Sequence, residues 1–350
     1  MSLGFHDAEL PGTHGRIFES VMAVESDPHA AATYRTNFDA HVECRDIQDV
    51  PSTAFPRADA LIGGPPCQGF STLNRDRQGD LRRLLWMEYE RALAATGASF
   101  FVMENVPQLL NSPEFNVFSS RVIERGWNIK AGILNAADYG VPQTRRRAIV
   151  IGSLLGEPTM PVATHAAPQV GPLHLLSDVG ADWLTVRDAI GDLPGVPDGR
   201  RWHRGRNPTS VSQIRYRHVP VGGSRFDMQR SLDAEGLGHL VPRCWRMKTS
   251  GTTDVFGRMW WDRPAPTLRT EFYKPEKGRY LHPDAHRPIT VREGARLMGF
   301  PDDFCFPEEQ ALTHVGRQIG NAVPPPLARA VAEALAEHAM AVGALPALAA

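Results

Sequence analysis

One cysteine lies where its thiol could act as a nucleophile. Cys67 follows the apolar run ADALIGG (58–64) within the Pro- and Gly-containing turn PPCQGFS (65–71), so we expect it just beyond the end of a strand. The thiolate is the reactive form of cysteine, and backbone N–H groups or nearby cations favour it over the thiol, whose free pKa is about 8.5. Cys67 is therefore the candidate nucleophile, and we interpret the remaining cysteines as small apolar side chains.

Charged and polar side chains border two other apolar runs. The run SFFVMENV ends with Glu104, and the stretch QTRRR supplies Gln143, Arg145 and Arg147 ahead of the run RAIVIGS. A thiol, a carboxyl group and guanidinium groups can thus meet at one edge of a sheet. This combination indicates covalent catalysis assisted by an acid or base.

The elements that would position these groups alternate along the first part of the chain. Apolar runs that end in polar or Gly residues are separated by helix-like stretches, which is typical of β-α units around an open, doubly wound parallel sheet. In such sheets the chemistry gathers beyond the carboxyl ends of the strands. The expected strands are 20–27, 58–64, 99–106 and 147–153, and the expected helices are 28–38 and 87–97.

The composition changes after the fourth run. Between about Leu154 and Val255 the chain is rich in Pro, Gly, His and Arg with little periodicity, which predicts a smaller, loop-rich domain. The alternating order resumes after Trp261, and residues 324–340 predict a helix with Pro in its first turn. We expect three segments: a large domain (1–156), a smaller domain (157–258) and a C-terminal segment that completes the large domain (259–350).

Composition limits the class of protein. The 350 residues are 42% hydrophobic with a formal net charge of -1, so the chain can bury a full core but exerts no global attraction on nucleic acid. No run approaches the roughly 20 apolar residues of a membrane span, and the first residues do not resemble a signal peptide, so a cytoplasmic protein is expected. The spacing of the cysteines suggests neither a disulfide framework nor a metal site.

Five stretches carry a family resemblance. PPCQGFS, ENV, QTRRR, RPITVREGARLMGFPDDF (287–304) and QIGNAVPPPLA (318–328) occur in the order seen in DNA (cytosine-5)-methyltransferases, and the resemblance covers most of the chain. It implies an α/β fold: a Rossmann-like S-adenosylmethionine-dependent methyltransferase sheet with a smaller, loop-rich target-recognition domain. Residues 160–255 match poorly, where the family carries its variable target-recognition region.

The resemblance also implies catalytic roles. Cytosine C5 is too electron-poor to take a methyl group directly, so the family adds a thiolate to C6, and Cys67 would be that nucleophile. Glu104 would hold the base at N3 and the exocyclic amine, and Arg145 would hold O2. Arg147 would support the loop or Glu104. No metal is required.

Contacts to duplex DNA follow from the same resemblance. The target base must be flipped out of the stack, and CQGFSTLNRDRQGD resembles the loop that closes over it. In this loop Gln68, Ser71, Arg75 and Arg77 would face the DNA. A local basic segment offers further phosphate contacts, because its arginines are opposed only by Asp227 between positions 200 and 230. Its candidates are Arg200, Arg201, Arg204, Arg206, Arg215 and Arg217.

Some residues of the binding site for S-adenosylmethionine can be predicted from the sequence. Glu25 ends an apolar run, where a carboxylate can accept hydrogen bonds from ribose hydroxyls. Asp46 with Ile47 resembles the adenine-binding position of the family, although Arg45 stands where Gly is usual. By resemblance Pro66 would offer its carbonyl near the cofactor, and Asn321 would support the methionine end.

The sequence departs from the family at its beginning. The family opens with a strand and a Gly-rich turn of the FxGxGG kind, whereas MSLGF resembles the residues after that turn. We therefore expect a sheet without its first, normally central strand. A start codon assigned too far downstream, a truncated inactive copy, and completion by another chain are the three explanations, and the first is favoured.

Two other functions stay open at this stage. One branch of the family modifies RNA with the same nucleophile, so an RNA cytosine-5 methyltransferase is the first alternative. The second is a DNA-binding protein without catalysis, either truncated or one half of a split enzyme. The expected partners are duplex DNA and a cognate restriction endonuclease acting on the same site, and the expected state is a monomer.

Overall fold

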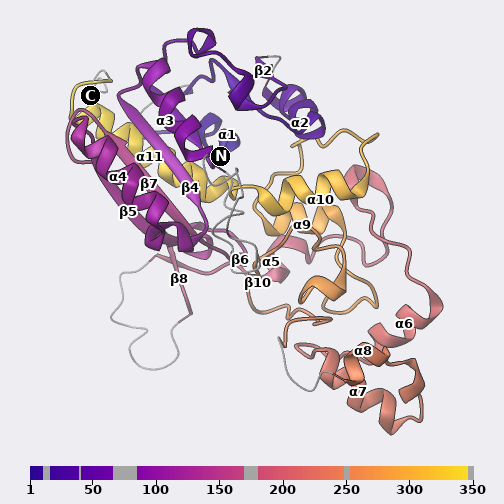
Figure 1. The fold of residues 1–350 in the computed structure, drawn as a ribbon. Helices are drawn as coiled ribbons and strands as arrows, with labels where there is room; N and C mark the ends of the chain where they lie inside the picture. The colour runs from indigo at the N-terminus through magenta and orange to yellow at the C-terminus, as the bar shows by residue number, and fades with distance from the viewer. Residues whose placement is uncertain (11–15, 39–40, 66–84, 169–179, 248–252, 346–350) are drawn as a thin grey trace. The chain divides into compact units, whose positions relative to one another are not determined.

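The computed structural model describes residues 1–10, 16–38, 41–65, 85–168, 180–247 and 253–345. These residues divide into two compact units, described here one at a time (Figure 1). Unit 1 comprises 1–140, 145–182 and 323–350, and unit 2 comprises 141–144 and 183–322.

A four-stranded sheet forms the centre of unit 1. Its order is β3 (Ala60–Gly63), β4 (Phe100–Asn105), β7 (Arg146–Ser153) and β5 (Asn128–Asn135). Strands β3 and β4 are parallel, whereas β7 runs antiparallel to both neighbours. The expectation of a wholly parallel sheet is therefore wrong at β7. The reason is the short connection 136–145, which lacks an α-helix, because a parallel crossover needs a dozen or more residues and usually a helix.

A second, smaller sheet in unit 1 pairs β1 (Ala23–Val24) with β2 (Val42–Glu43) in parallel. Helix α2 (Pro28–Phe38) connects the two strands and confirms the helix predicted at 28–38. Within the described residues, this pair is not hydrogen-bonded to the four-stranded sheet.

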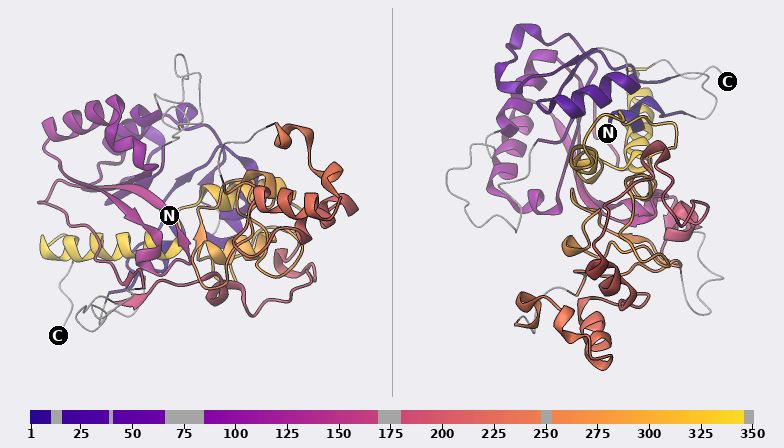
Figure 2. Two further views of the ribbon diagram at one scale, coloured as in Figure 1. Left: turned by 90° about the horizontal axis from the view of Figure 1, so that it is seen from below. Right: turned by 90° about the vertical axis from the view of Figure 1, so that its right-hand side faces the viewer.

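Helices cover both faces of the four-stranded sheet (Figures 1 and 2). On one face the Phe101 ring contacts Phe118 of α4 (Pro113–Glu124), and Tyr89 of α3 (Leu85–Thr96) joins the same apolar cluster. On the other face Phe100 packs edge-on against His338 of α11 (Pro325–Ala341). This alternation follows from the two-residue period of a strand. Helices α3 and α11 confirm the helices predicted at 87–97 and 324–340 within a few residues.

Close packing at the centre of the sheet requires one glycine. Gly152 of β7 lies opposite Phe101 of β4, and a Cβ atom at Gly152 would come within 2.0 Å of the Phe101 ring. Since no side chain fits there, Gly allows the ring to lie flat across the neighbouring strand.

The remaining elements of unit 1 are short. Helix α1 packs against α11, and β8 pairs in parallel with β9. Their bounds, with those of the 3₁₀ turns, are α1 (Ser2–His6), β8 (His165–Ala166), β9 (Ala181–Asp182), η1 (Ile47–Asp49), η2 (Ser52–Ala54), η4 (Pro107–Asn111) and η5 (Ala136–Tyr139).

Unit 2 contains short helices around one parallel strand pair. Strand β6 pairs with β10, and α9 contacts both α5 and α10. Helices α6, α7 and α8 lie together in Figures 1 and 2. The bounds are β6 (Gln143–Thr144), α5 (Val186–Ile190), η7 (Arg200–Trp202), α6 (Ser210–Arg217), α7 (Arg225–Ala234), η8 (Gly238–Leu240), α8 (Arg243–Arg246), β10 (Ala265–Pro266), η9 (Pro275–Lys277), α9 (Val291–Leu297) and α10 (Leu312–Asn321).

Helices α6, α7 and α8 correct the expectation of a loop-rich segment between 154 and 255. The local signals for α6 and α7 are caps rather than periodicity. The Thr209 hydroxyl accepts from the Ser212 N–H, and Ser224 with Asp227 forms a capping box. Their apolar residues pack into one buried cluster that includes Met228 and Leu232, so tertiary contacts stabilise these polar helices.

The compact units partition the chain differently from the three predicted segments: residues 157–182 belong to unit 1 and residues 259–322 to unit 2. Because a compact unit need not coincide with a functional domain, the functional boundaries stay predictions. None of the described helices is both long and apolar enough to cross a membrane. Among the described residues, no group of His, Cys, Asp or Glu side chains is suited to hold a metal ion.

Candidate active site

The carboxyl group of Glu104 lies at the end of β4, beside the start of β7. In the register of these strands Glu104 is opposite Ile149 and Asn105 is opposite Ala148, so Arg147 lies one residue further along β7. Arg147 Nε is 2.9 Å from Glu104 Oε1, and the two side chains are only 13% and 11% exposed. Pairing of distant strands therefore creates an almost buried ion pair from residues that lie apart in the sequence.

Burial governs the protonation of this carboxyl group. Removal from water raises the pKa of Glu104 above its ordinary value, and the positive charges of Arg147 and Arg145 only partly oppose this effect. A carboxyl group with a raised pKa retains a proton more readily near neutral pH. In its protonated form Glu104 would both accept and donate hydrogen bonds.

Arg145 occupies the connection between β6 and β7 and is only 1% exposed. Its backbone is held on both sides, because its N–H donates to Asn135 Oδ1 at 3.1 Å and its carbonyl accepts from the Ala136 N–H at 2.9 Å. Its charge lowers the pKa of Glu104, which places the guanidinium near that carboxyl group. The structure thus brings together Glu104, Arg145 and Arg147, as the sequence predicted.

The chain that leads toward Cys67 begins beside Glu104. A Cβ atom at Gly64 would lie 3.1 Å from Glu104 Oε2, and Asn105 Nδ2 donates to the Pro65 carbonyl at 2.8 Å. Asn105 was not singled out from the sequence, although its place next to Glu104 in the ENV motif was a signal. It ties the end of β4 to the start of the PPCQGFS turn.

Six predicted site residues lie outside the described part of the chain. They are Pro66, Cys67, Gln68, Ser71, Arg75 and Arg77. Their roles stay predictions.

The predicted cofactor residues Glu25, Asp46 and Ile47 lie where β1 and β2 end. The Glu25 N–H donates to the Glu43 carbonyl at 3.0 Å, so Glu25 lies beside the end of β2. Glu25 Oε1 accepts from the Asp27 N–H at 2.8 Å, and Asp46 Oδ1 accepts from the Gln48 N–H at 3.0 Å. These bonds orient two acceptor carboxylates at the carboxyl end of a parallel pair.

Arg45 stands beside these carboxylates and forms an ion pair with Glu43, with 2.8 Å between Nη2 and Oε2.

Asn321 ends α10 in unit 2 and is exposed. Its predicted contact with the cofactor stays a prediction.

Gln143 differs in position from the two arginines of its motif. It belongs to unit 2 and is fully buried, where Nε2 donates to the Leu297 carbonyl at 3.0 Å and Oε1 accepts from the Leu268 N–H at 2.9 Å. Both the nitrogen and the oxygen of its side-chain amide are therefore hydrogen-bonded to the backbone of unit 2. These bonds join β6 to the end of α9 and to the chain after β10.

The arginines of the basic segment fall into two groups. Arg204 Nη2 donates to the Glu308 carbonyl, Arg215 Nε donates to the Leu240 carbonyl, and Arg206 lies 3.8 Å from Glu276. Arg200, Arg201 and Arg217 are exposed, and no ion pair involves them within the described residues. The DNA contacts stay predictions, and the structure singles out the second group as available for partners.

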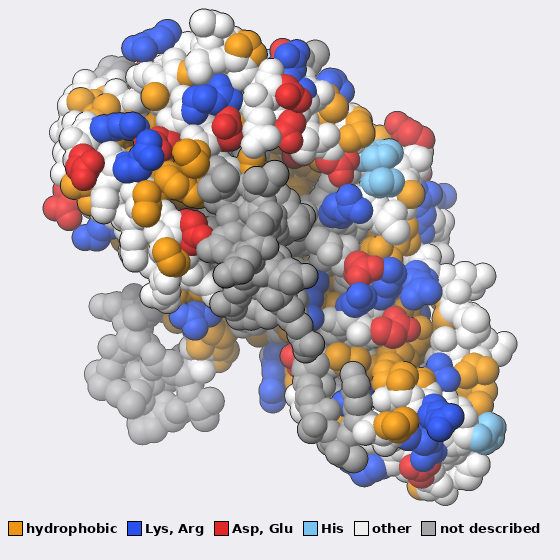
Figure 3. Space-filling view, in the orientation of Figure 1, with side chains coloured by type: hydrophobic (Ala, Val, Ile, Leu, Met, Phe, Trp, Pro, Cys, Tyr) orange, Lys and Arg blue, Asp and Glu red, His pale blue; other side chains and the backbone are white. Residues whose placement is uncertain are grey.

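Basic side chains are not concentrated in one field on the face drawn in Figure 3, where Lys and Arg alternate with Asp and Glu. This distribution fits the net charge of -1. A net charge this small provides no general attraction for a polyanion, so such binding would depend on local arginines.

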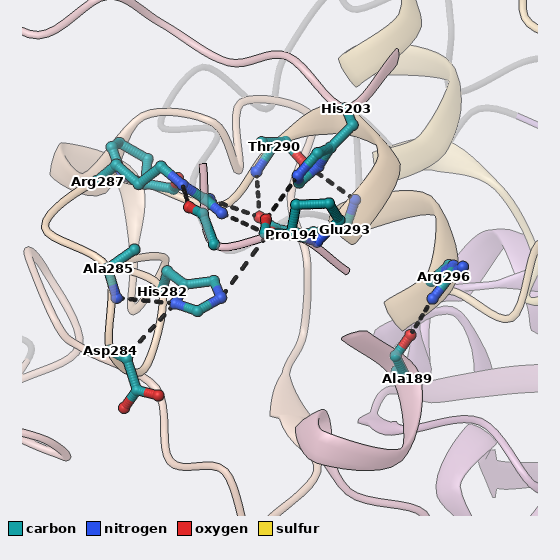
Figure 4. A network of polar contacts seen from close by, with 12 residues as sticks. Ala189, Pro194, His203, His282, Asp284, Ala285, Arg287, Thr290, Glu293 and Arg296 are labelled. Atoms are coloured by element: carbon teal, nitrogen blue, oxygen red, sulfur yellow. Dashed lines mark hydrogen bonds and ion pairs between the residues drawn. The ribbon is translucent and has the colours of Figure 1, made fainter. Parts of the chain in front are cut away.

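A buried ionic network organises the stretch 287–304 (Figure 4). The Arg287 guanidinium donates to both oxygens of Glu293, at 2.8 and 2.7 Å, and the Thr290 N–H donates to Glu293 Oε2 at 2.6 Å. Glu293 is fully buried; burial opposes its ionisation, but these donors hold its pKa below its ordinary value. Burial also lowers the pKa of nearby His282 to about 4, so His282 is neutral at pH 7. Only the capping pattern of Thr290 and Glu293 could have indicated this network from the sequence.

Comparison with known proteins is consistent with this geometry. Residues 1–337 match the family model described as C-5 cytosine-specific DNA methylase. The chain is 34% identical to the Type II methyltransferase M1.HphI of Haemophilus parahaemolyticus, over 91% of this chain and 81% of that protein. It is 30% identical to the Type II methylase M.HgiDII of Herpetosiphon aurantiacus, over 92% of this chain and 91% of that protein.

Solved structures share the fold at lower sequence identity. A prophage-encoded protein of E. coli superposes with a TM-score of 0.66 at 24% identity, covering 96% of this chain and 95% of its own. The Dnmt2 methyltransferase of S. pombe superposes with a TM-score of 0.60 at 16% identity, covering 93% and 92%.

Proposed function

Because the chain belongs to the C-5 cytosine-specific DNA methylase family, it is a DNA (cytosine-5)-methyltransferase, and we propose that Cys67, Glu104 and Arg145 act on the target cytosine. The observation that carries this assignment of residues is the nearly buried Glu104 carboxyl group, paired with Arg147 at 2.9 Å. The lead-in to Cys67 lies beside the same carboxyl group at Gly64, and the Pro65 carbonyl accepts from the side chain of the neighbouring Asn105.

The proposed steps use each of these groups in turn. The Cys67 thiolate adds to C6 of cytosine, and Glu104 shares a proton with N3 as negative charge develops on the ring. The raised pKa of Glu104 suits a carboxyl group that holds a proton at this point. S-adenosylmethionine, when bound, supplies the methyl group for C5. Loss of the C5 proton and of the Cys67 sulfur then restores the aromatic ring.

We propose different roles for Arg145 and Arg147. Arg145, fixed by its backbone bonds, would donate to O2 of the base, where a planar guanidinium favours an oxygen acceptor. Arg147 would position Glu104 through their ion pair. Because both arginines approach a carboxyl group of low exposure, their electrostatic effect is stronger than it would be in water.

The residues at the ends of β1 and β2 fit the nucleoside part of S-adenosylmethionine. Each of Glu25 and Asp46 uses one oxygen on a backbone N–H, which leaves its other oxygen to accept from ribose hydroxyls or the adenine amine. Ile47 would offer an apolar contact to adenine. Pro66 and Asn321 would hold the methionine part.

We propose duplex DNA as the partner surface for two groups of residues. Gln68, Ser71, Arg75 and Arg77 would close over the flipped base, which must leave the stack because C6 is not accessible within the duplex. The basic segment of unit 2 would contact phosphates. The relatives M1.HphI and M.HgiDII carry Type II names, which supports a cognate restriction endonuclease as a biological partner. We also propose a monomer that works in the cytoplasm.

The finer description of the fold is also a proposal. We assign residues 1–156 to catalysis and cofactor binding, 157–258 to target recognition and 259–350 to completion of the catalytic domain. The pair β1–β2 and the strands β3–β4–β7–β5 would be two parts of one Rossmann-like sheet that lacks a first, central strand. In support, β1 pairs only with β2 and β3 only with β4 among the described strands.

The experiment that tests the proposed chemistry uses the mechanism itself. A duplex with 5-fluorocytosine at the target should form a covalent adduct with the protein, because fluorine cannot leave as the proton does. The Cys67→Ser variant should form no adduct and transfer no methyl group, yet bind duplex DNA within a few-fold of the unmodified protein. Cys305→Ser, a change at an exposed cysteine, is the matched control and should behave as the unmodified protein does. Adduct formation through another cysteine would refute the assignment.

A further inference from the structure

The turn before α6 contains backbone strain that its local sequence does not demand. Gly199 has a φ of 78°, and the two consecutive non-glycine residues Arg201 and Trp202 have φ values of 44° and 67°. L-amino acids with a Cβ atom rarely adopt this left-handed region, and a pair in sequence is rarer still. Such outliers persist only where surrounding contacts enforce them.

The contacts that enforce this conformation are buried. The Trp202 side chain is 2% exposed, and its Nε1 donates to the Phe306 carbonyl at 2.7 Å. His203 is bonded on both ring nitrogens, to Thr290 Oγ1 at 3.1 Å and to the Pro194 carbonyl at 2.9 Å. The turn is therefore anchored directly beside Arg201.

Two arginines complete the anchor. Arg292 Nε donates to the Arg201 carbonyl at 2.6 Å, and the Arg204 guanidinium stacks 3.7 Å from the centre of the Trp202 ring. Arg204 and Arg292 are thus occupied in holding the backbone. The side chain of Arg201 takes no part in this anchor.

Packing accounts for the side chains at the other strained positions but not at Arg201. The non-glycine residues with positive φ among the described residues are Arg201, Trp202 and Phe256. Trp202 and Phe256 are each 2% exposed, so burial of a large ring offsets the strain. Arg201 is exposed, and within the described residues no hydrogen bond, ion pair or aromatic stack involves its side chain. A glycine would fit its backbone better.

Two acidic side chains near this turn have hydrogen-bond partners. Asp302, whose pKa is lowered in part by Arg201, is bound by Arg296 at 2.9 and 2.6 Å. Asp198 accepts the Arg200 N–H at 3.0 Å. Arg200 and Arg201 therefore present two adjacent positive charges on a fixed backbone.

We infer that this anchored turn, residues 199–204, is a preformed phosphate contact in which Arg201 binds the DNA backbone. The inference rests on the proposed action on duplex DNA and assigns the contact to one arginine of the six predicted candidates. A guanidinium held on a rigid turn loses less conformational freedom on binding than one on a flexible loop. Arg201 therefore contributes affinity that does not depend on the base sequence.

The test separates binding from stability by replacing Arg201 with residues that accept positive φ. Arg201→Gly relieves the strain and removes the charge, so we expect a melting temperature equal to or above that of the unmodified protein. Its affinity for a fluorescent mixed-sequence duplex should fall by about three- to tenfold at about 0.1 M salt, and the slope of log affinity against log salt should decrease by about 0.9. Arg201→Asn, which also tolerates this conformation, should give the same result if the Gly variant folds poorly.

Two further variants define the controls. Arg201→Lys keeps the charge and should retain the salt slope. Arg230→Ala removes an exposed arginine that is ion-paired with Asp227, and it should change neither measurement. An unchanged affinity and slope in Arg201→Gly and Arg201→Asn would overturn the inference. Failure of the unmodified protein to bind duplex DNA or to form the Cys67 adduct would instead refute the proposed function.

Discussion

Replacing Arg147 with Met should destabilise the protein by leaving the Glu104 carboxylate without its nearest counter-charge. The pair is 2.9 Å apart, and its side chains are only 13% and 11% exposed. Removing one partner of a buried ion pair costs about 3–5 kcal/mol, because the other charge is left in a poorly hydrated place. Since Arg145 remains nearby, we expect the lower end of this range, about 3 kcal/mol at pH 8.

The loss should depend on pH in a defined direction. Burial already raises the pKa of Glu104, and Arg147 is the largest influence that opposes this rise. Without Arg147 the folded-state pKa rises further above the unfolded value. Above the folded-state pKa, Glu104 is charged in the folded protein, and this buried charge lowers the free energy of unfolding. The loss disappears as pH falls through the folded-state pKa, because the carboxyl group then takes up a proton. The Arg147→Met deficit should therefore be larger at pH 8 than at pH 5.

The assay is urea denaturation at pH 8 and pH 5 of four variants. Arg146→Met is the matched control, because Arg146 is exposed on the same strand and forms no ion pair within the described residues. Glu104→Gln removes the charge that Arg147 offsets, so the double variant Arg147→Met/Glu104→Gln should recover most of the lost stability at pH 8. Equal losses in Arg146→Met and Arg147→Met, or a deficit independent of pH, would refute the reasoning.

Two other predictions concern the elements around the site. Asn105→Ala should lower kcat about tenfold while leaving DNA affinity nearly unchanged, because the hydrogen bond from Asn105 to Pro65 orients the start of the PPCQGFS turn. Steady-state kinetics and a binding titration would test this. A change in KM alone would contradict it. Arg287→Met should lower the free energy of unfolding by about 3–5 kcal/mol at pH 7, because the buried Glu293 carboxylate loses its ion-pair partner. Because the pKa of Glu293 is lowered in the folded protein, its stabilising contribution exists above its unfolded pKa and is lost as pH falls through the folded value. Denaturation at pH 7 and pH 4 should therefore show the unmodified protein losing its advantage over Arg287→Met in acid, and a constant difference would contradict this.

Several features of this protein were predictable from local sequence. Helix α2 was expected as a helix-like stretch between apolar runs, and helix α11 was expected because Pro marks its first turn. Glu104 was expected at the end of a strand because its apolar run stops there, and Arg147 was expected at the start of a strand because its apolar run begins there. The family was recognisable because five short motifs occur in a fixed order, which does not require knowledge of any contact.

Other features depend on pairing between distant segments. The antiparallel direction of β7 is seen in its pairing with β4 and β5, and helices α6 to α8 depend on an apolar cluster that they share. The separation of Arg201 from Arg204 as exposed and engaged arginines could not be seen, since both belong to the same polar stretch.

The physical reason is the range of the interactions involved. Apolar periodicity, caps and the order of motifs are written in the amino-acid sequence itself, so they can be recognised without knowing any tertiary contact. The partners of Trp202 and Gln143 lie 104 and 154 residues further along the chain, and the φ of Arg201 is enforced by contacts of that kind. Only a folded backbone brings such groups within hydrogen-bonding distance, and only there does a buried charge acquire its neighbours and its pKa.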